Sequence, residues 1–219
     1  MDWSISARAV AIALIVGAVA LPGPAAAAGP ALAGHYRLHD GPNTASELVL
    51  KPDGKFDYFL TAGSLDEMAH GLWRAEGNSL RLQTLPKPVP PSFAAGPITS
   101  VPGEALVIHV TAPSGEGISA VYFTLGFDSG EPVLDYTQDY GWSLTGDDKR
   151  TPRWIEFSLP IYALQSQRFA IDRSKGNSFN FILTPNDLGK IDFSAVQIDI
   201  QPHAVVMHRW ESTLTYRAD

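Results

Sequence analysis

The stretch KPDGKFDYFLTAGSLDEMAHGLW, residues 51–73, indicates the fold class more directly than any other part of the chain. Its first half alternates, with apolar Phe56, Tyr58 and Leu60 on one face and polar residues between them. A period of two residues is typical of a half-buried β-strand. The Pro-Asp-Gly at residues 52–54 predicts a turn, because proline presets φ and glycine accepts positive φ. The stretch therefore predicts a strand that follows a tight turn.

The second half of this stretch gathers residues that bind metals or move protons, namely Asp66, Glu67 and His70. Ser64 lies three residues before Glu67, which is the spacing of a capping box on one helical turn. Such a turn offers at most three ligands, and capping already explains two of the polar residues. We therefore interpret residues 61–71 as the bend between two strands and not as an active site.

The same alternation and turn pattern extends on both sides of the stretch. The segments GHYRLHD, SELVL, GLWRAE and SLRLQT are further predicted strands, and Gly77-Asn78 predicts a hairpin turn. This gives about five strands before residue 85. The segment ELVLKPDGKFDYFL…GLWRAEGNSLRLQ resembles the small lipocalin-like β-barrels and half-barrels of bacterial exported proteins. Gly71 and Trp73 match their Gly-x-Trp motif. The resemblance covers residues 34–84 and implies a protein that binds ligands, inhibits partners or senses envelope stress.

Residues 85–103 contain six prolines, which predict a semi-rigid extended linker and a domain boundary. Residues 104–219 then resume short alternating segments. Pro113, Gly115 and Gly117 form a turn between two of them, and residues 104–128 are similar to the opening hairpin of carboxypeptidase-regulatory-like and transthyretin-like β-sandwiches. The sequence thus predicts an all-β protein, with a small antiparallel β-meander or half-barrel at residues 29–84 followed by a β-sandwich at residues 104–219.

The first 28 residues have the parts of a secretory signal peptide, with Arg8, an apolar segment, helix-breaking prolines and small residues near Ala28. We expect cleavage there and a periplasmic or secreted protein. No later segment is apolar enough to span a membrane, and the chain has no cysteine. The formal net charge of −7 and the absence of a Lys/Arg cluster argue against nucleic acid as a partner.

Residues 127–154 combine acids with aromatic side chains, and they contain the candidate binding residues. These are Asp135, Asp139, Tyr140 and Trp142, in an arrangement that suits sugar rings and their hydroxyl groups. The alternative is that Trp142 and Trp154 anchor the core while the acids solvate loops. The spacing fits no calcium loop, and we predict no metal site and no cofactor.

No common catalytic signature occurs in the sequence, so it names no catalytic residue. Our first hypothesis for this exported all-β chain is a non-catalytic binding or interaction module of the bacterial envelope, with an envelope protein or polysaccharide as its partner. The alternative is a carbohydrate-active hydrolase that uses paired carboxylates in residues 128–148.

Overall fold

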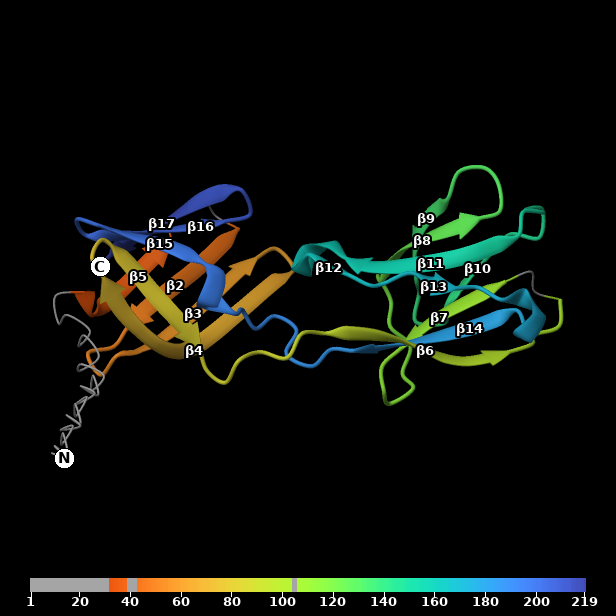
Figure 1. The fold of residues 1–219 in the computed structure, drawn as a ribbon, viewed down its shortest axis with the longest axis horizontal. Coiled ribbons are helices and arrows are strands. Elements are labelled where there is room, and N and C mark those ends of the chain that lie inside the picture. The colour runs from red at the N-terminus through yellow and green to blue at the C-terminus, as the bar shows by residue number, and fades with distance from the viewer. Residues whose placement is uncertain (1–31, 39–42, 104–105) are drawn as a thin grey trace, which may run out of the picture.

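The structure, a computed structural model, describes residues 32–38, 43–103 and 106–219. They form two lobes, a β-barrel and a β-sandwich, which follow one another along the long axis of the molecule (Figure 1). The fold is all-β, as the sequence predicts. The predicted signal peptide, residues 1–28, lies outside the described residues. Within the described part of the chain, no helix has the length and hydropathy of a bilayer-spanning segment.

The barrel lobe is a closed sheet of eight strands in the order β1-β17-β16-β15-β5-β4-β3-β2, with β2 pairing β1. The strands are β1 (Gly34–Leu38), β2 (Thr44–Leu50), β3 (Lys55–Ala62), β4 (Leu65–Glu76), β5 (Ser79–Thr84), β15 (Gln197–Gln201), β16 (Ala204–Arg209) and β17 (Ser212–Ala218). All neighbours are antiparallel, so this is an up-and-down barrel. Closure is made by β1 and β17, where Tyr36 lies opposite Ala218.

The barrel interior is filled by side chains from alternate strand positions. Phe56, Tyr58 and Leu60, which the sequence places on one face, are at most 3% exposed. The short helix η4, Phe193–Ala195, adds Phe193, whose ring centroid lies 5.7 Å from that of Phe56 and 4.9 Å from that of Tyr58. The interior is therefore a packed core. Burying each such side chain contributes about 1.5–3 kcal/mol to the free energy of folding.

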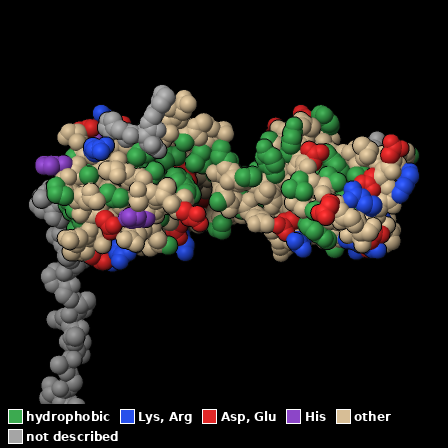
Figure 2. All heavy atoms as spheres, turned by 90° about the horizontal axis from the view of Figure 1, so that it is seen from above, with side chains coloured by type: hydrophobic (Ala, Val, Ile, Leu, Met, Phe, Trp, Pro, Cys, Tyr) green, Lys and Arg blue, Asp and Glu red, His purple; other side chains and the backbone are tan. Residues whose placement is uncertain are grey.

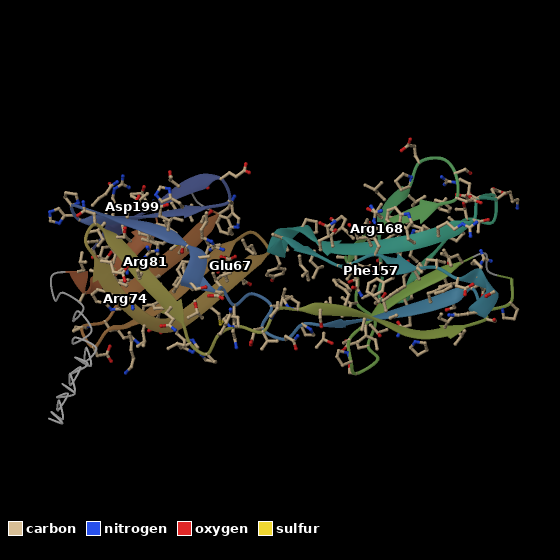
Figure 3. The ribbon with its side chains drawn as sticks, in the orientation of Figure 1. Glu67, Arg74, Arg81, Phe157, Arg168 and Asp199 are labelled. Atoms are coloured by element: carbon tan, nitrogen blue, oxygen red, sulfur yellow. The ribbon has the colours of Figure 1, made fainter. Side chains whose placement is uncertain are left out.

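The sandwich lobe consists of two sheets. The first has the order β10-β7-β14-β6, and the second has the order β12-β11-β8-β9 with β13 also paired to β11. The elements are β6 (Ser92–Thr99), β7 (Val107–Thr111), β8 (Tyr122–Phe127), β9 (Val133–Tyr136), β10 (Trp142–Ser143), β11 (Pro152–Leu159), η2 (Pro160–Tyr162), β12 (Leu164–Gln165), β13 (Phe169–Ala170), η3 (Arg173–Lys175) and β14 (Ser178–Thr184). Phe157 lies between the sheets (Figure 3), with its ring centroid 4.8 Å from that of Phe181 and 5.3 Å from that of Phe93.

The boundary between the lobes differs from the predicted one in two places. Residues 92–99, which the sequence assigns to the linker, form the edge strand β6 and pair with β14. An edge strand accommodates Pro97, because the missing N–H is not needed on the solvent side. Residues 197–218, which the sequence assigns to the sandwich, form three barrel strands instead. Five strands alone would leave two open edges, and these three strands cover them. The sandwich is therefore an insertion between β5 and β15.

Two connections join the lobes, residues 85–91 on the way out and residues 185–191 on the way back. They are hydrogen-bonded to each other. The Val89 N–H donates to the Asp187 carboxylate at 2.9 Å, and the Val89 carbonyl accepts from the Asp187 N–H at 3.1 Å. The predicted proline-rich linker is thus one half of a paired connection.

The returning connection also binds the barrel wall. The Met68 N–H donates to the Gly189 carbonyl at 2.8 Å, and the Ile191 N–H donates to the Met68 carbonyl at 3.0 Å. Gly189 has φ of +84°, and a Cβ there would lie 2.8 Å from the Asp66 carbonyl oxygen. Only glycine fits this approach, so the connection runs against β4 like a short extra strand.

The helical turn predicted within residues 61–71 is wrong. Gly63 and Ser64 form a two-residue loop between β3 and β4, with Ala62 opposite Leu65. Glu67 therefore lies in a strand and points inward, where it is 7% exposed. A Ser-x-x-Glu spacing fits both structures, and the pairing with β3 selects the strand.

The insertion can be tested by removing it. We expect a chain in which a short Gly/Ser linker replaces residues 92–184 to fold as a barrel, because both sets of barrel strands remain. A chain that ends at Asn186 should lose the barrel, since it lacks three of the eight strands. Dispersion of amide signals in NMR spectra distinguishes the outcomes. A disordered barrel in the first variant would contradict the assignment.

Candidate functional site

A polar cluster, the barrel-end network, lies inside the barrel beside the connections to the sandwich. It consists of Ser46, Tyr58, Glu67, Arg209 and Tyr216, of which Figure 3 labels Glu67. The Glu67 carboxylate accepts from Arg209 through both oxygens, at 2.7 and 3.0 Å. Arg209 also donates to the Tyr58 hydroxyl at 3.3 Å, and the Ser46 and Tyr216 hydroxyls lie 2.9 Å apart. Burial raises the pKa of both tyrosines.

The barrel-end network pairs its own charges. Burial lowers the pKa of Arg209, but the hydrogen bond and charge of Glu67 raise it more, so the net shift is upward. Glu67 also borders a groove of about 370 Å³ between the lobes, but both of its oxygens already accept from Arg209. We therefore interpret the network as the structural closure of this barrel end.

The Glu67–Arg209 ion pair should be strongly coupled. The two side chains are 6% and 10% exposed, so Glu67→Gln would leave the arginine charge buried without an anion. We expect a loss of about 3–5 kcal/mol in the free energy of unfolding, and much less for the double variant Glu67→Leu/Arg209→Met. Urea unfolding of both variants measures this. A single-variant loss below about 1 kcal/mol would show that the pair is unimportant.

Two of the four predicted binding residues, Asp135 and Trp142, contact each other at the margin of the sandwich core. The Trp142 indole N–H donates to the Asp135 carboxylate at 2.7 Å. Its ring packs edge-on against Phe123, with 5.0 Å between centroids. The alternative interpretation, in which Trp142 anchors the core, describes this position.

The other two predicted residues lie in the turn that leads from the second sheet to the first. Tyr140 is 77% exposed. The Asp139 carboxylate accepts the Tyr140 N–H at 2.9 Å, which is a local turn interaction. The four predicted residues thus divide into a packed pair and an exposed turn, and they do not form one surface.

The acids at either end of residues 128–148 hold loops in place. Arg150 donates to Asp148 at 2.6 Å and lowers the pKa of that carboxyl to about 2. The Thr151 N–H donates to Asp128 at 3.1 Å and lowers its pKa as well. A glycosidase needs a general acid with a raised pKa, the opposite of these two carboxyls. In the described residues, no three His, Asp or Glu side chains gather as a metal site.

The outer face of the second sandwich sheet carries exposed apolar side chains that the sequence analysis did not select. Tyr122 is 50% exposed, Leu134 is 74% exposed and Tyr136 is 46% exposed. Tyr122 lies opposite Tyr136, with ring centroids 5.8 Å apart and planes inclined by 50°. We call this surface the aromatic face. Figure 2 looks onto it and shows hydrophobic side chains there among acidic ones.

Polar groups lie beside these rings on the same face. In the cross-strand register Ser158 is opposite Tyr122, and Glu156 is opposite Thr124. Glu156 accepts hydrogen bonds from Gln165 and from Arg168, the latter at 3.0 Å. The Gln165 bond and then the Arg168 bond lower the pKa of Glu156, so the carboxylate is ionised and paired with the guanidinium.

Trp154 borders the aromatic face, although its ring is covered. The Arg168 guanidinium lies 3.9 Å from the ring centroid. A Cβ at Gly126 would lie 2.1 Å from the indole, so the indole lies flat on β8. One of the two interpretations of the sequence placed Trp154 in the core, but Ile155 and Phe157 take the core side of β11.

Comparison with known proteins supplies no relative. No protein-family model, curated protein or solved structure matches the chain. The resemblances of residues 34–84 and 104–128 stay predictions, and the function is inferred from this chain's own residues.

The sequence contained a signal for the aromatic face. Val121, Phe123 and Leu125 alternate as a buried face, which turns Tyr122 outward. The sequence alone does not show that β8 pairs with β9, and this pairing is what brings Tyr136 beside Tyr122. The aromatic face could therefore be recognised only from the structure.

Proposed function

We propose that the protein is a non-catalytic binding protein of the bacterial cell envelope, and that its aromatic face holds an extended, uncharged polysaccharide. The observation that carries the proposal is the pair of neighbouring, half-exposed tyrosines on an uncovered sheet face. Sugar rings have apolar C–H faces that pack on aromatic rings, and hydroxyl edges that hydrogen-bond to polar side chains.

The charge of the aromatic face supports an uncharged ligand. Its ionised Glu156 is paired with Arg168, so the two charges cancel. Ser158, Thr124 and Gln165 add uncharged donors and acceptors around the rings. Hydroxyl groups suit such a surface better than phosphate or carboxylate groups do.

The size of the apolar patch favours a polysaccharide over a protein partner. A stable protein interface buries about 800 Å² on each side, well beyond what three side chains offer. A sugar ring is about as large as one aromatic side chain. The apolar segment at the start of the chain supports an envelope or secreted location, where polysaccharides are abundant.

The proposal predicts a loss of binding without a loss of stability. Tyr122→Ala and Tyr136→Ala should each weaken retention on a soluble neutral glucan or galactomannan by about tenfold, as expected when a stacking contact of about 1.4 kcal/mol is removed. Melting temperatures should stay close to wild type, because both side chains are half exposed. Affinity gel electrophoresis and thermal melts measure both effects.

Tyr140→Ala is the matched control, since this exposed tyrosine lies in the turn outside the aromatic face. It should leave retention unchanged. Absence of retention on every neutral polysaccharide in the panel, or equal retention of all three variants, would overturn the proposal.

A further inference from the structure

The outer wall of the barrel has a hollow of about 470 Å³ over β4 and β5, away from the aromatic face. Leu72, Arg74, Arg81 and Gln83 point outward along it, while Trp73 and Leu82 between them point into the core. Leu72 is 46% exposed and gives the hollow an apolar wall. We call it the arginine hollow.

Two arginines face each other in the arginine hollow. Arg74 lies directly opposite Arg81 in the β4–β5 register, and Figure 3 shows both on neighbouring strands. Like charges in this position destabilise a sheet unless something neutralises them. Glu76 accepts from the Nε of Arg74 at 2.6 Å and from the Nε of Arg81 at 3.1 Å. One carboxylate thus serves two guanidinium groups. The other acid of the hollow, Asp53, is paired with Lys55 at 2.8 Å, so a net charge of +1 remains.

The guanidinium groups keep hydrogen-bonding capacity for a ligand. Glu76 accepts from the Nε of each, and within the described residues their Nη atoms donate no hydrogen bond. A guanidinium has five N–H donors, so the four Nη–H donors of each arginine remain, in a planar fork that matches a carboxylate. The side chains of Arg74 and Arg81 are 62% and 54% exposed, so the forks are accessible.

We propose that the arginine hollow binds a small organic monoanion, with its carboxylate on the forks of Arg74 and Arg81 and its apolar body against Leu72. A monoanion neutralises the residual charge of +1, whereas a dianion would leave a net negative charge beside Glu76. The chain as a whole carries a formal charge of −7, so this local positive site is opposite in sign to the rest of the molecule. The site belongs to the barrel and does not depend on the polysaccharide proposal.

Titration of the full chain with benzoate, followed by ¹⁵N NMR, tests this site. Benzoate should shift the amide signals of residues 72–83 in a saturable way, and arginine Nε signals with them. Benzyl alcohol, which lacks the anion, should bind at least about tenfold more weakly, since a charged hydrogen bond contributes about that factor. Acetate keeps the carboxylate but lacks the apolar body, so it should bind more weakly because it loses the contact with Leu72. Inorganic phosphate should also bind more weakly than benzoate.

Substitutions of Arg74 and Arg81 distinguish the contribution of guanidinium geometry to binding from that of positive charge. Arg74→Gln/Arg81→Gln should weaken benzoate binding about tenfold or more, and Arg74→Lys/Arg81→Lys should weaken it as well, because lysine keeps the charge without the fork. The control Arg173→Gln/Lys175→Gln removes the same charge from the sandwich and should bind as wild type does. Melting curves confirm that each variant is folded. Equal benzoate binding by all variants, or shifts confined to other residues, would overturn the proposal, as would phosphate binding as tight as that of benzoate.

Discussion

The pairing of β1 with β17 is the constraint on which the rest of the structure depends. It joins strands from opposite ends of the described chain, with Tyr36 opposite Ala218 and Leu38 opposite Tyr216. A closed sheet has no edge that can pair with another chain, whereas the five strands before residue 85 would expose two. Closure also completes the core, because Tyr216 packs near Tyr58, with ring centroids 6.4 Å apart.

Closure also determines how the sandwich is held. The chain leaves the barrel after β5 and must return to begin β15, so the two connections run beside each other. The hydrogen bonds between Val89 and Asp187, and between Met68 and the returning connection, follow from this proximity. The Glu67–Arg209 pair lies at the same end of the barrel and joins β4 to β16 across its interior. Barrel and sandwich thus present separate surfaces, an arginine hollow on one and an aromatic face on the other.

Local features could be predicted from the sequence because their causes are local. The alternation of Phe56, Tyr58 and Leu60 and the turn at Gly77-Asn78 depend only on neighbours in the chain. The partners of distant strands could not be predicted this way. The alternating residues 197–218 suit either lobe, and only closure assigns them to the barrel. Likewise, the inward position of Glu67 is stable only because Arg209, 142 residues later in the chain, pairs with its carboxylate.

The candidate site shows the same limit. Residue types near position 140 suggested aromatics beside acids, but strand pairing turned Trp142 and Asp135 toward each other. A register shift between Pro152 and Trp154 accompanies the outward position of the Trp154 indole, which one interpretation of the sequence placed in the core. Tyr122 and Tyr136 became neighbours only through the pairing of β8 with β9. A surface built by cross-strand neighbours cannot be recognised from sequence spacing alone.

A disulfide across the closing seam tests the central claim most directly, because the chain has no cysteine of its own. Arg37 lies opposite Arg217 on β1 and β17, and opposite Glu47 on β2. The double variant Arg37→Cys/Arg217→Cys should oxidise within one molecule under mild conditions, as neighbouring strands lie about 5 Å apart. Glu47→Cys/Arg217→Cys, separated by two strand spacings of about 10 Å in total, should not. Intramolecular oxidation of the first pair and not the second, measured by thiol mass spectrometry, is the result that closure predicts. No disulfide in the first pair, or only disulfide-linked dimers, would contradict it.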